Sequence, residues 1–188
     1  MSDSKGAETL IASSSMVCIR RKELIEQLLL QLDDADPIVR QDAAIALGDL
    51  ERDASFAVPH LLARLQSANV SPHDRACAAW ALGRIGSSAI TRQLLSVLQS
   101  TADQPEADEL RRCIAEAIEQ LTSDCEVMLQ VARICLMSGS LKCKLIGLSL
   151  VGRLGQSRRE LSAHLEPLVH DDCAVVRDAA KQVLSELA

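Results

Sequence analysis

The sequence predicts an all-α protein, an α-α superhelix built from about five stacked helical hairpins. Apolar residues recur along most of the chain at the spacing of an amphipathic helix. A turn followed by a small, apolar helix returns every 33 to 36 residues, and a two-helix repeat of this period is typical of a solenoid. Aromatic residues make up only 1% of the chain, so closely packed helices must fill the core with Leu, Ile, Val and Ala.

The chain divides into a lead-in and a repeat domain. Residues 1–21 contain Ser, Ala and Gly without a clear period, which predicts a flexible lead-in with at most a short helical segment near residues 16–21. The helical period becomes plain at residue 22 and continues to residue 188. We divide this repeat domain into units at about 22–52, 53–86, 87–122, 123–156 and 157–188.

The first unit contains the best-formed hairpin. One face of its first helix is apolar, carrying Leu24, Ile25, Leu28, Leu29 and Leu32. After an acidic turn, Asp36 is suited to cap the second helix, and Pro37 suits its first position. That second helix is predicted to run to about Leu50.

The four later units repeat this hairpin with different turns. First helices are predicted over 58–65, 90–98, 127–134 and 161–168. In unit two, Ser71 precedes a proline and is placed to cap a second helix that closes at Gly86. The remaining second helices are predicted over 107–121, 141–154 and 174–187, after turns at 100–106, 138–140 and 170–172.

A basic residue occupies the same register position near the start of every second helix. These residues are Arg40, Arg75, Arg111, Lys144 and Arg177. Six residues before the first and the last lie Asp34 and Asp171, which are placed to pair with their arginines across the turn. We therefore predict a structural ladder in which basic side chains bind turn acids and carbonyl groups within and between repeats.

The pattern D-x-D-P-x-V-R-x-x-A-A-x-A-L-G at residues 34–48 resembles a HEAT repeat, and residues 170–180 repeat it well. The short, Ala-rich form is similar to the HEAT-like repeats of phycobilisome lyase subunits. The resemblance covers about residues 22–188 and departs where Glu119 replaces the glycine and where Gly147 and Leu148 replace the alanine pair. It implies a HEAT-like solenoid, a fold that serves many unrelated functions.

The resemblance also implies that the second helices line a concave surface. At about 100° per residue, residues such as Val39, Ala43 and Leu47 face the core, and the opposite positions face outward. Trp80 is on the outward side, so we predict a partner-binding surface around it. Its residues are Ile45, Trp80, Arg84, Arg112, Glu116, Leu145 and Arg153. The alternative is that Trp80 only packs on a neighbouring helix or covers the lead-in.

Residues for catalysis, cofactors or metals are not grouped in the sequence. The seven cysteines form no C-x-x-C pair, so we interpret them as reduced thiols in a cytosolic protein. The repeat enzyme deoxyhypusine hydroxylase resembles this fold but ligates iron through His-Glu pairs, and this chain has no His-Glu dipeptide. We therefore predict no catalytic residue, no cofactor and no metal.

Charge and hydropathy limit the classes of partner that the chain is expected to bind. A net charge of −6 argues against a broad grip on nucleic acid, and no apolar run is long enough to span a membrane. The first 22 residues lack the pattern of a secretory signal, which favours a cytoplasmic location. The leading hypothesis is a non-enzymatic scaffold for a protein or peptide. A phycobilin lyase-like subunit or chaperone is the alternative, and a DNA-binding HEAT domain is disfavoured.

Overall fold

A computed structural model describes residues 19–101, 104–154 and 159–186 of the chain. Throughout these residues the chain forms helices and turns and contains no strand, which confirms the predicted all-α fold. The predicted lead-in falls mostly on residues 1–18, which lie outside the described residues, while residues 19–21 belong to the first helix.

Each unit contributes a first helix and a second helix. The first helices are the helix over residues 19–31, α3 (Val58–Gln66), α5 (Thr91–Ser100), α7 (Cys125–Leu136) and α9 (Ser162–Leu165). The second helices are α2 (Pro37–Asp49), α4 (Pro72–Ile85), α6 (Asp108–Leu121), α8 (Leu141–Arg153) and α10 (Ala174–Ser185). Short 3-10 helices extend several of them, namely η1 (Glu51–Ala57), η2 (Ser88–Ile90), η3 (Pro105–Ala107) and η5 (Glu166–His170).

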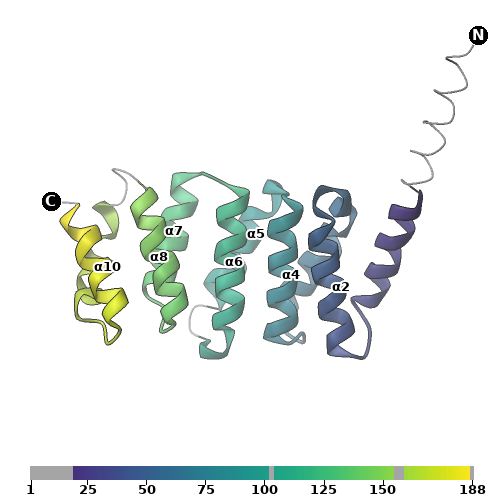
Figure 1. Ribbon diagram of the computed structural model, residues 1–188, viewed down its shortest axis with the longest axis horizontal. Coiled ribbons are helices and arrows are strands. Elements are labelled where there is room, and N and C mark those ends of the chain that lie inside the picture. The colour runs from purple at the N-terminus through teal and green to yellow at the C-terminus, as the bar shows by residue number, and fades with distance from the viewer. Residues whose placement is uncertain (1–18, 102–103, 155–158, 187–188) are drawn as a thin grey trace, which may run out of the picture.

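The helices form two layers. In one layer α2 packs on α4, α4 on α6, α6 on α8 and α8 on α10; in the other, α5 packs on α7 and α7 on α9. Figure 1 shows the second helices side by side in a row, with the helix over residues 19–31 and α10 at opposite ends. We call the exposed side of this row the second-helix face.

Local capping chemistry starts α2 and α4, and ends α4, where the sequence predicts. The Asp36 side chain accepts a hydrogen bond from the backbone N–H of Ile38, and Pro37 is the first residue of α2. Ser71 caps α4 in the same way through the N–H of Asp74. Gly86 ends α4 with a φ of 82°, a left-handed conformation that glycine adopts without a steric cost.

α3 matches the helix predicted over 58–65, but the 3-10 segment before it was not predicted, and the first helix of unit five differs from its prediction. The chain enters unit two through η1, which is kinked at Ala54 before α3 begins at Val58. In unit five the predicted helix over 161–168 is broken into α9 and η5, and Pro167 stands at the start of the 3-10 segment. Proline lacks the N–H for a helical hydrogen bond, so Pro167 fits near the start of a helical segment and not inside one.

The core is aliphatic, as the composition requires. Its largest fully buried side chains are all leucine or isoleucine, including Leu47, Leu82 and Ile114. Alanines bring the helices close together, and Trp80 is only partly buried against the core. Among the described residues, no helix is both long and apolar enough to cross a membrane.

Candidate functional site

A shallow groove lies on the second-helix face around Trp80. It has a volume of about 210 Å³ and is formed by α2, α4 and α6. Three residues of the predicted surface line it, namely Ile45, Trp80 and Arg112. The others are His73, Ala76, Cys77, Glu109 and Cys113. The structure therefore places part of the predicted surface in one apolar depression with a charged rim.

Trp80 is held in place by packing. A Cβ atom added at Gly48 would lie 2.6 Å from Cζ3 of the indole and 3.0 Å from its Cε3, so the ring lies directly on the α2 backbone. The Arg84 guanidinium stands 5.7 Å from the centre of the indole ring, within the range of a cation–π interaction. Trp80 thus packs on a neighbouring helix and also lines the groove, so the two sequence interpretations are compatible.

Arg112 is fixed between two carboxylates of its own helix. Its Nε donates to Glu109 at 3.1 Å, and its Nη1 donates to Glu116 at 2.6 Å. The hydrogen bond that Arg112 donates to Glu109 is the main reason that the pKa of Arg112 is raised, and the bond that it donates to Glu116 adds to it. The bond from Arg112 likewise holds the pKa of Glu109 below its usual value.

The other predicted surface residues lie outside this groove. Arg84 bonds Glu51 at 3.0 Å and lies 4.0 Å from Asp49. Leu145 is half-buried and packs against the core, and Arg153 forms an ion pair with Glu119. Leu145 and Arg153 therefore extend the second-helix face toward unit four without lining the depression at Trp80.

The basic ladder bonds mostly to turn carbonyls. Arg40 donates to the backbone oxygens of Asp34 and Ala35, both at 2.9 Å, rather than to the Asp34 carboxylate, which accepts from the N–H of Asp36. Arg177 likewise donates to the backbone oxygens of Asp171 and Asp172. The remaining contacts are Arg75 with the Leu65 carbonyl, Arg111 with the Thr101 and Gln104 carbonyls and with Asp108, and Lys144 with the Asp171 carboxylate in the next unit.

Asp74 forms a buried charge cluster that the sequence analysis missed. Only 2% exposed, it accepts hydrogen bonds from Arg40 at 2.8 and 3.0 Å, from Gln41 at 2.9 Å and from Arg64 at 3.4 Å. Burial raises its pKa, but the bonds from Gln41 and Arg40 and the charges of Arg40 and Arg64 outweigh this and lower it. The available signal was an acid at the register position where unit one has Val39, which was predicted to face the core.

The thiols in the groove are poor nucleophiles. Burial is the main cause that raises the pKa of Cys77, and it raises that of Cys113 to about 11. A thiol must be deprotonated to attack, and these pKa values oppose it at neutral pH. Across the part of the chain that the structure describes, no group of three or more His, Cys, Asp or Glu side chains is arranged to hold a metal ion.

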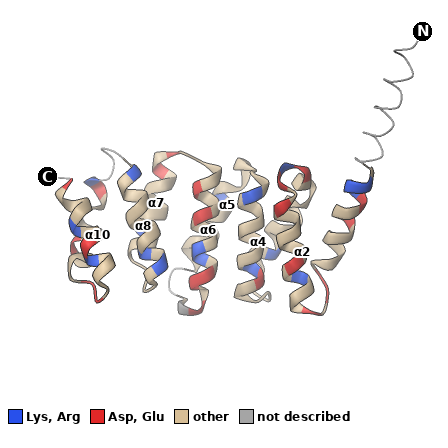
Figure 2. Ribbon diagram, in the orientation of Figure 1, with Lys and Arg blue, Asp and Glu red and all other residues tan. Residues whose placement is uncertain are grey.

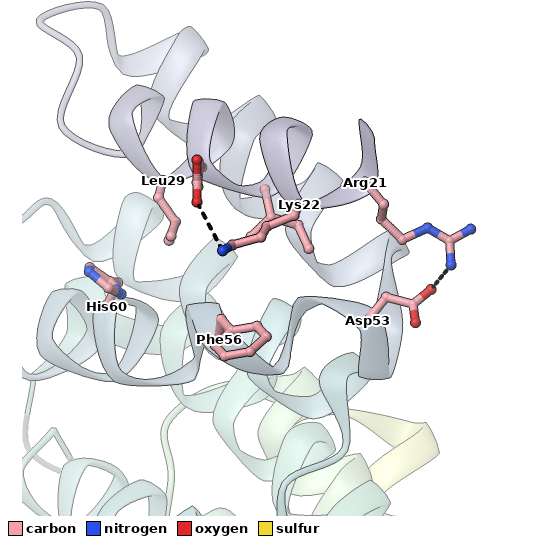
Figure 3. A pocket seen from close by; sticks show the side chains of 8 residues that line it. Arg21, Lys22, Leu29, Asp53, Phe56 and His60 are labelled. Atoms are coloured by element: carbon pink, nitrogen blue, oxygen red, sulfur yellow. Dashed lines mark hydrogen bonds and ion pairs between the residues drawn. The ribbon is translucent and has the colours of Figure 1, made fainter. Parts of the chain in front are cut away.

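A larger cavity of about 480 Å³ lies between the helix over residues 19–31 and η1. Figure 3 shows Phe56 facing this helix, below Lys22 and Leu29. An ion pair of 2.5 Å between Arg21 and Asp53 joins the two walls at one side. The sequence analysis did not predict this cavity, because its opening depends on the 3-10 geometry of η1.

The comparison with protein families agrees with this two-layer arrangement. The family model described as HEAT repeats matches residues 24–131, which is more than half of the chain. The chain belongs to the HEAT-repeat family. Among solved structures it is similar to human deoxyhypusine hydroxylase in complex with glycerol, at 17% identity and a TM-score of 0.43, over 87% of this chain and 84% of that chain. No curated protein matches it.

Proposed function

We propose that this HEAT-repeat chain is a non-enzymatic interaction scaffold that binds a protein or peptide partner on its second-helix face. The single observation that carries the proposal is the groove at Trp80. An indole held rigidly on α2 loses little conformational freedom when a partner binds, and tryptophan and arginine are the residues that most often anchor interfaces.

The size of the groove favours side chains over a cofactor. Pockets for cofactors and drug-sized ligands occupy roughly 300 to 1,000 Å³, and the groove at Trp80 has about 210 Å³. This volume supports the scaffold over a phycobilin lyase-like activity at this face. The free thiols of Cys77 and Cys113 support a reducing compartment such as the cytoplasm.

The proposal is tested by capturing partners with substituted chains. Three variants change the groove: Ile45→Asp, Trp80→Ala and Arg112→Glu. The matched control is Leu30→Asp, because Leu30 is 80% exposed on the first helix of unit one. Partners are identified by affinity purification with mass spectrometry, and their affinity is then measured with purified proteins. Circular dichroism melting checks that every variant is folded.

We expect the groove variants to weaken binding about tenfold or more, as the loss of an interface anchor does, and Leu30→Asp to leave it unchanged. If a partner bound all four variants as tightly as the original chain, the second-helix face would not be the binding surface.

A further inference from the structure

We infer that the partner segment held on the second-helix face is cationic, with arginine or lysine side chains placed beside Trp80. This inference rests on the proposed function and concerns the same groove. It is carried by the juxtaposition of an apolar floor with arginines that are each already paired with two carboxylates. The remaining negative charge is what a basic partner would complement.

The first shared arginine is Arg84, next to the indole. Glu51 lies 3.0 Å from its guanidinium and Asp49 lies 4.0 Å from it. These three side chains are 40 to 63% exposed, so they stand at the surface where a partner would meet them. One positive charge cannot balance two carboxylates, and a net negative charge remains beside Trp80.

The second shared arginine is Arg112, on the other side of the groove. Glu109 and Glu116 both accept its hydrogen bonds. Figure 2 shows the same order along α6, where acidic segments lie on both sides of the basic one. The two arginines therefore do not make the surface basic, although both were predicted as partner-binding residues.

The charged groups that act on the thiol of Cys77, on the α4 side of the groove, are carboxylates. After burial, the largest contributions that raise the pKa of Cys77 come from the carboxylates of Asp74, Glu109 and Asp42. At Cys113 the largest effect of a charge on the pKa is the lowering effect of Arg112, and the charges of Glu109 and Glu116 oppose it by raising the pKa. Additional positive charge comes from Lys142 and His73, both of which act on Glu109.

The carboxylates still outnumber the permanent cations around the groove. The carboxylates are Asp42, Asp49, Glu51, Glu109 and Glu116, and the cations are Arg84, Arg112 and Lys142. The aliphatic stem of a partner arginine or lysine can lie on Ile45 and Trp80 while its charged end reaches these acids. An acidic segment would be repelled by them, because like charges across an interface are costly.

The test uses two synthetic peptides of about 15 residues with leucines at identical helical positions. One carries arginine at its charged positions and the other carries glutamate. Trp80 is the only tryptophan of the chain, so its fluorescence reports binding at this groove directly. We expect the arginine peptide to change the emission of Trp80 in a saturable way, and the glutamate peptide to leave it unchanged.

Charge-neutral variants separate the groove from general attraction to an acidic protein. Glu51→Gln combined with Glu116→Gln removes two acids at the groove. Glu160→Gln combined with Glu166→Gln removes two exposed acids from unit five. At low salt, we expect the double variant at the groove to weaken binding of the arginine peptide about fivefold or more. The double variant in unit five should have a much smaller effect on this binding.

The outcomes distinguish this inference from the proposed function. If both peptides bind equally, or if both double variants weaken binding equally, the inference of a cationic partner is wrong. The second-helix face can still be a binding surface in either case. Binding of neither peptide also overturns this inference. The proposed function itself fails only if partners isolated with the original chain are unaffected by the groove variants.

Discussion

At the scale of single residues, Asp74 links units one and two. Its buried carboxylate accepts hydrogen bonds from Arg40 and Gln41 of α2 and from Arg64 of α3. Arg40 therefore does more than bind its own turn, because it also connects one unit to the next. The cost of burying these charges is offset only while all the partners remain in place.

We predict that Asp74→Asn destabilises the protein by about 3 kcal/mol at neutral pH, because it removes the buried carboxylate that two partly buried arginines share. Urea unfolding followed by circular dichroism measures this free energy. Asp172→Asn, at an exposed turn position, is the matched control and should change stability by less than about 0.5 kcal/mol.

The effect of Asp74→Asn on stability should depend on pH. The pKa of Asp74 is lowered in the folded protein, so its stabilising contribution is fully present above the unfolded value of about 3.9 and is lost as pH falls through the folded pKa. The difference in unfolding free energy between the original chain and Asp74→Asn should therefore shrink below about pH 4. A difference that stayed constant down to pH 2 would contradict this account.

At the scale of helices, the repeated glycine shows how neighbouring units fit together. Gly48, Gly83 and Gly152 share one register position on the second helices. A Cβ atom at Gly83 would lie 2.9 Å from the Cα of Ala117 on α6, whereas a Cβ atom at Gly152 would meet nothing within 4 Å. The glycine is therefore required where the next helix is close, and it is not required in unit four.

We predict opposite effects for the two substitutions to alanine. Gly83→Ala should destabilise the protein by about 1 to 3 kcal/mol, because backbone contacts with α6 must move apart. Gly152→Ala should stabilise it by up to about 1 kcal/mol through better helix propensity. Thermal unfolding of the two variants measures both, and a stabilising Gly83→Ala would show that α4 and α6 separate easily.

Features that depend on neighbouring residues in the sequence could be predicted. The caps at Asp36, Ser71 and Gly86 follow from side-chain and backbone chemistry within one turn. The kink at Ala54 was missed because it lies in a mostly polar connection between two units, where apolar periodicity gives no signal. The break at Pro167 was missed because it lies within an apolar run that also fits an ordinary helix. Apolar periodicity identifies a helical segment better than it identifies the type of helix.

The candidate site could be predicted in part, because some of its features depend only on residues within one helix. The outward direction of Ile45, Trp80 and Arg112 follows from helical geometry alone. That Glu109 and Cys113 line the groove depends on how α6 lies beside α4, which no pattern within one helix records.

At the scale of the whole molecule, the chain is a row of units that contact their neighbours. α4 and α6 have a second helix on each side and bury many side chains, whereas α10 stands at the end of the row and buries only Val176, Ala180 and Val183. In such arrays stability is approximately a sum of unit and interface contributions. The middle units should therefore be more stable than the last one.

This difference predicts a gradient in amide hydrogen exchange. Peptides from α4 and α6 should exchange most slowly. Peptides from α10 should exchange fastest among the second helices, because α10 buries only three side chains and contacts one other second helix. Exchange measured by mass spectrometry on the intact chain tests this. Adding the arginine peptide should slow exchange further in α2, α4 and α6 and leave α10 unchanged. Equal protection of all second helices would instead indicate that the row opens as one cooperative unit, in which a contact at Trp80 is felt at its far end.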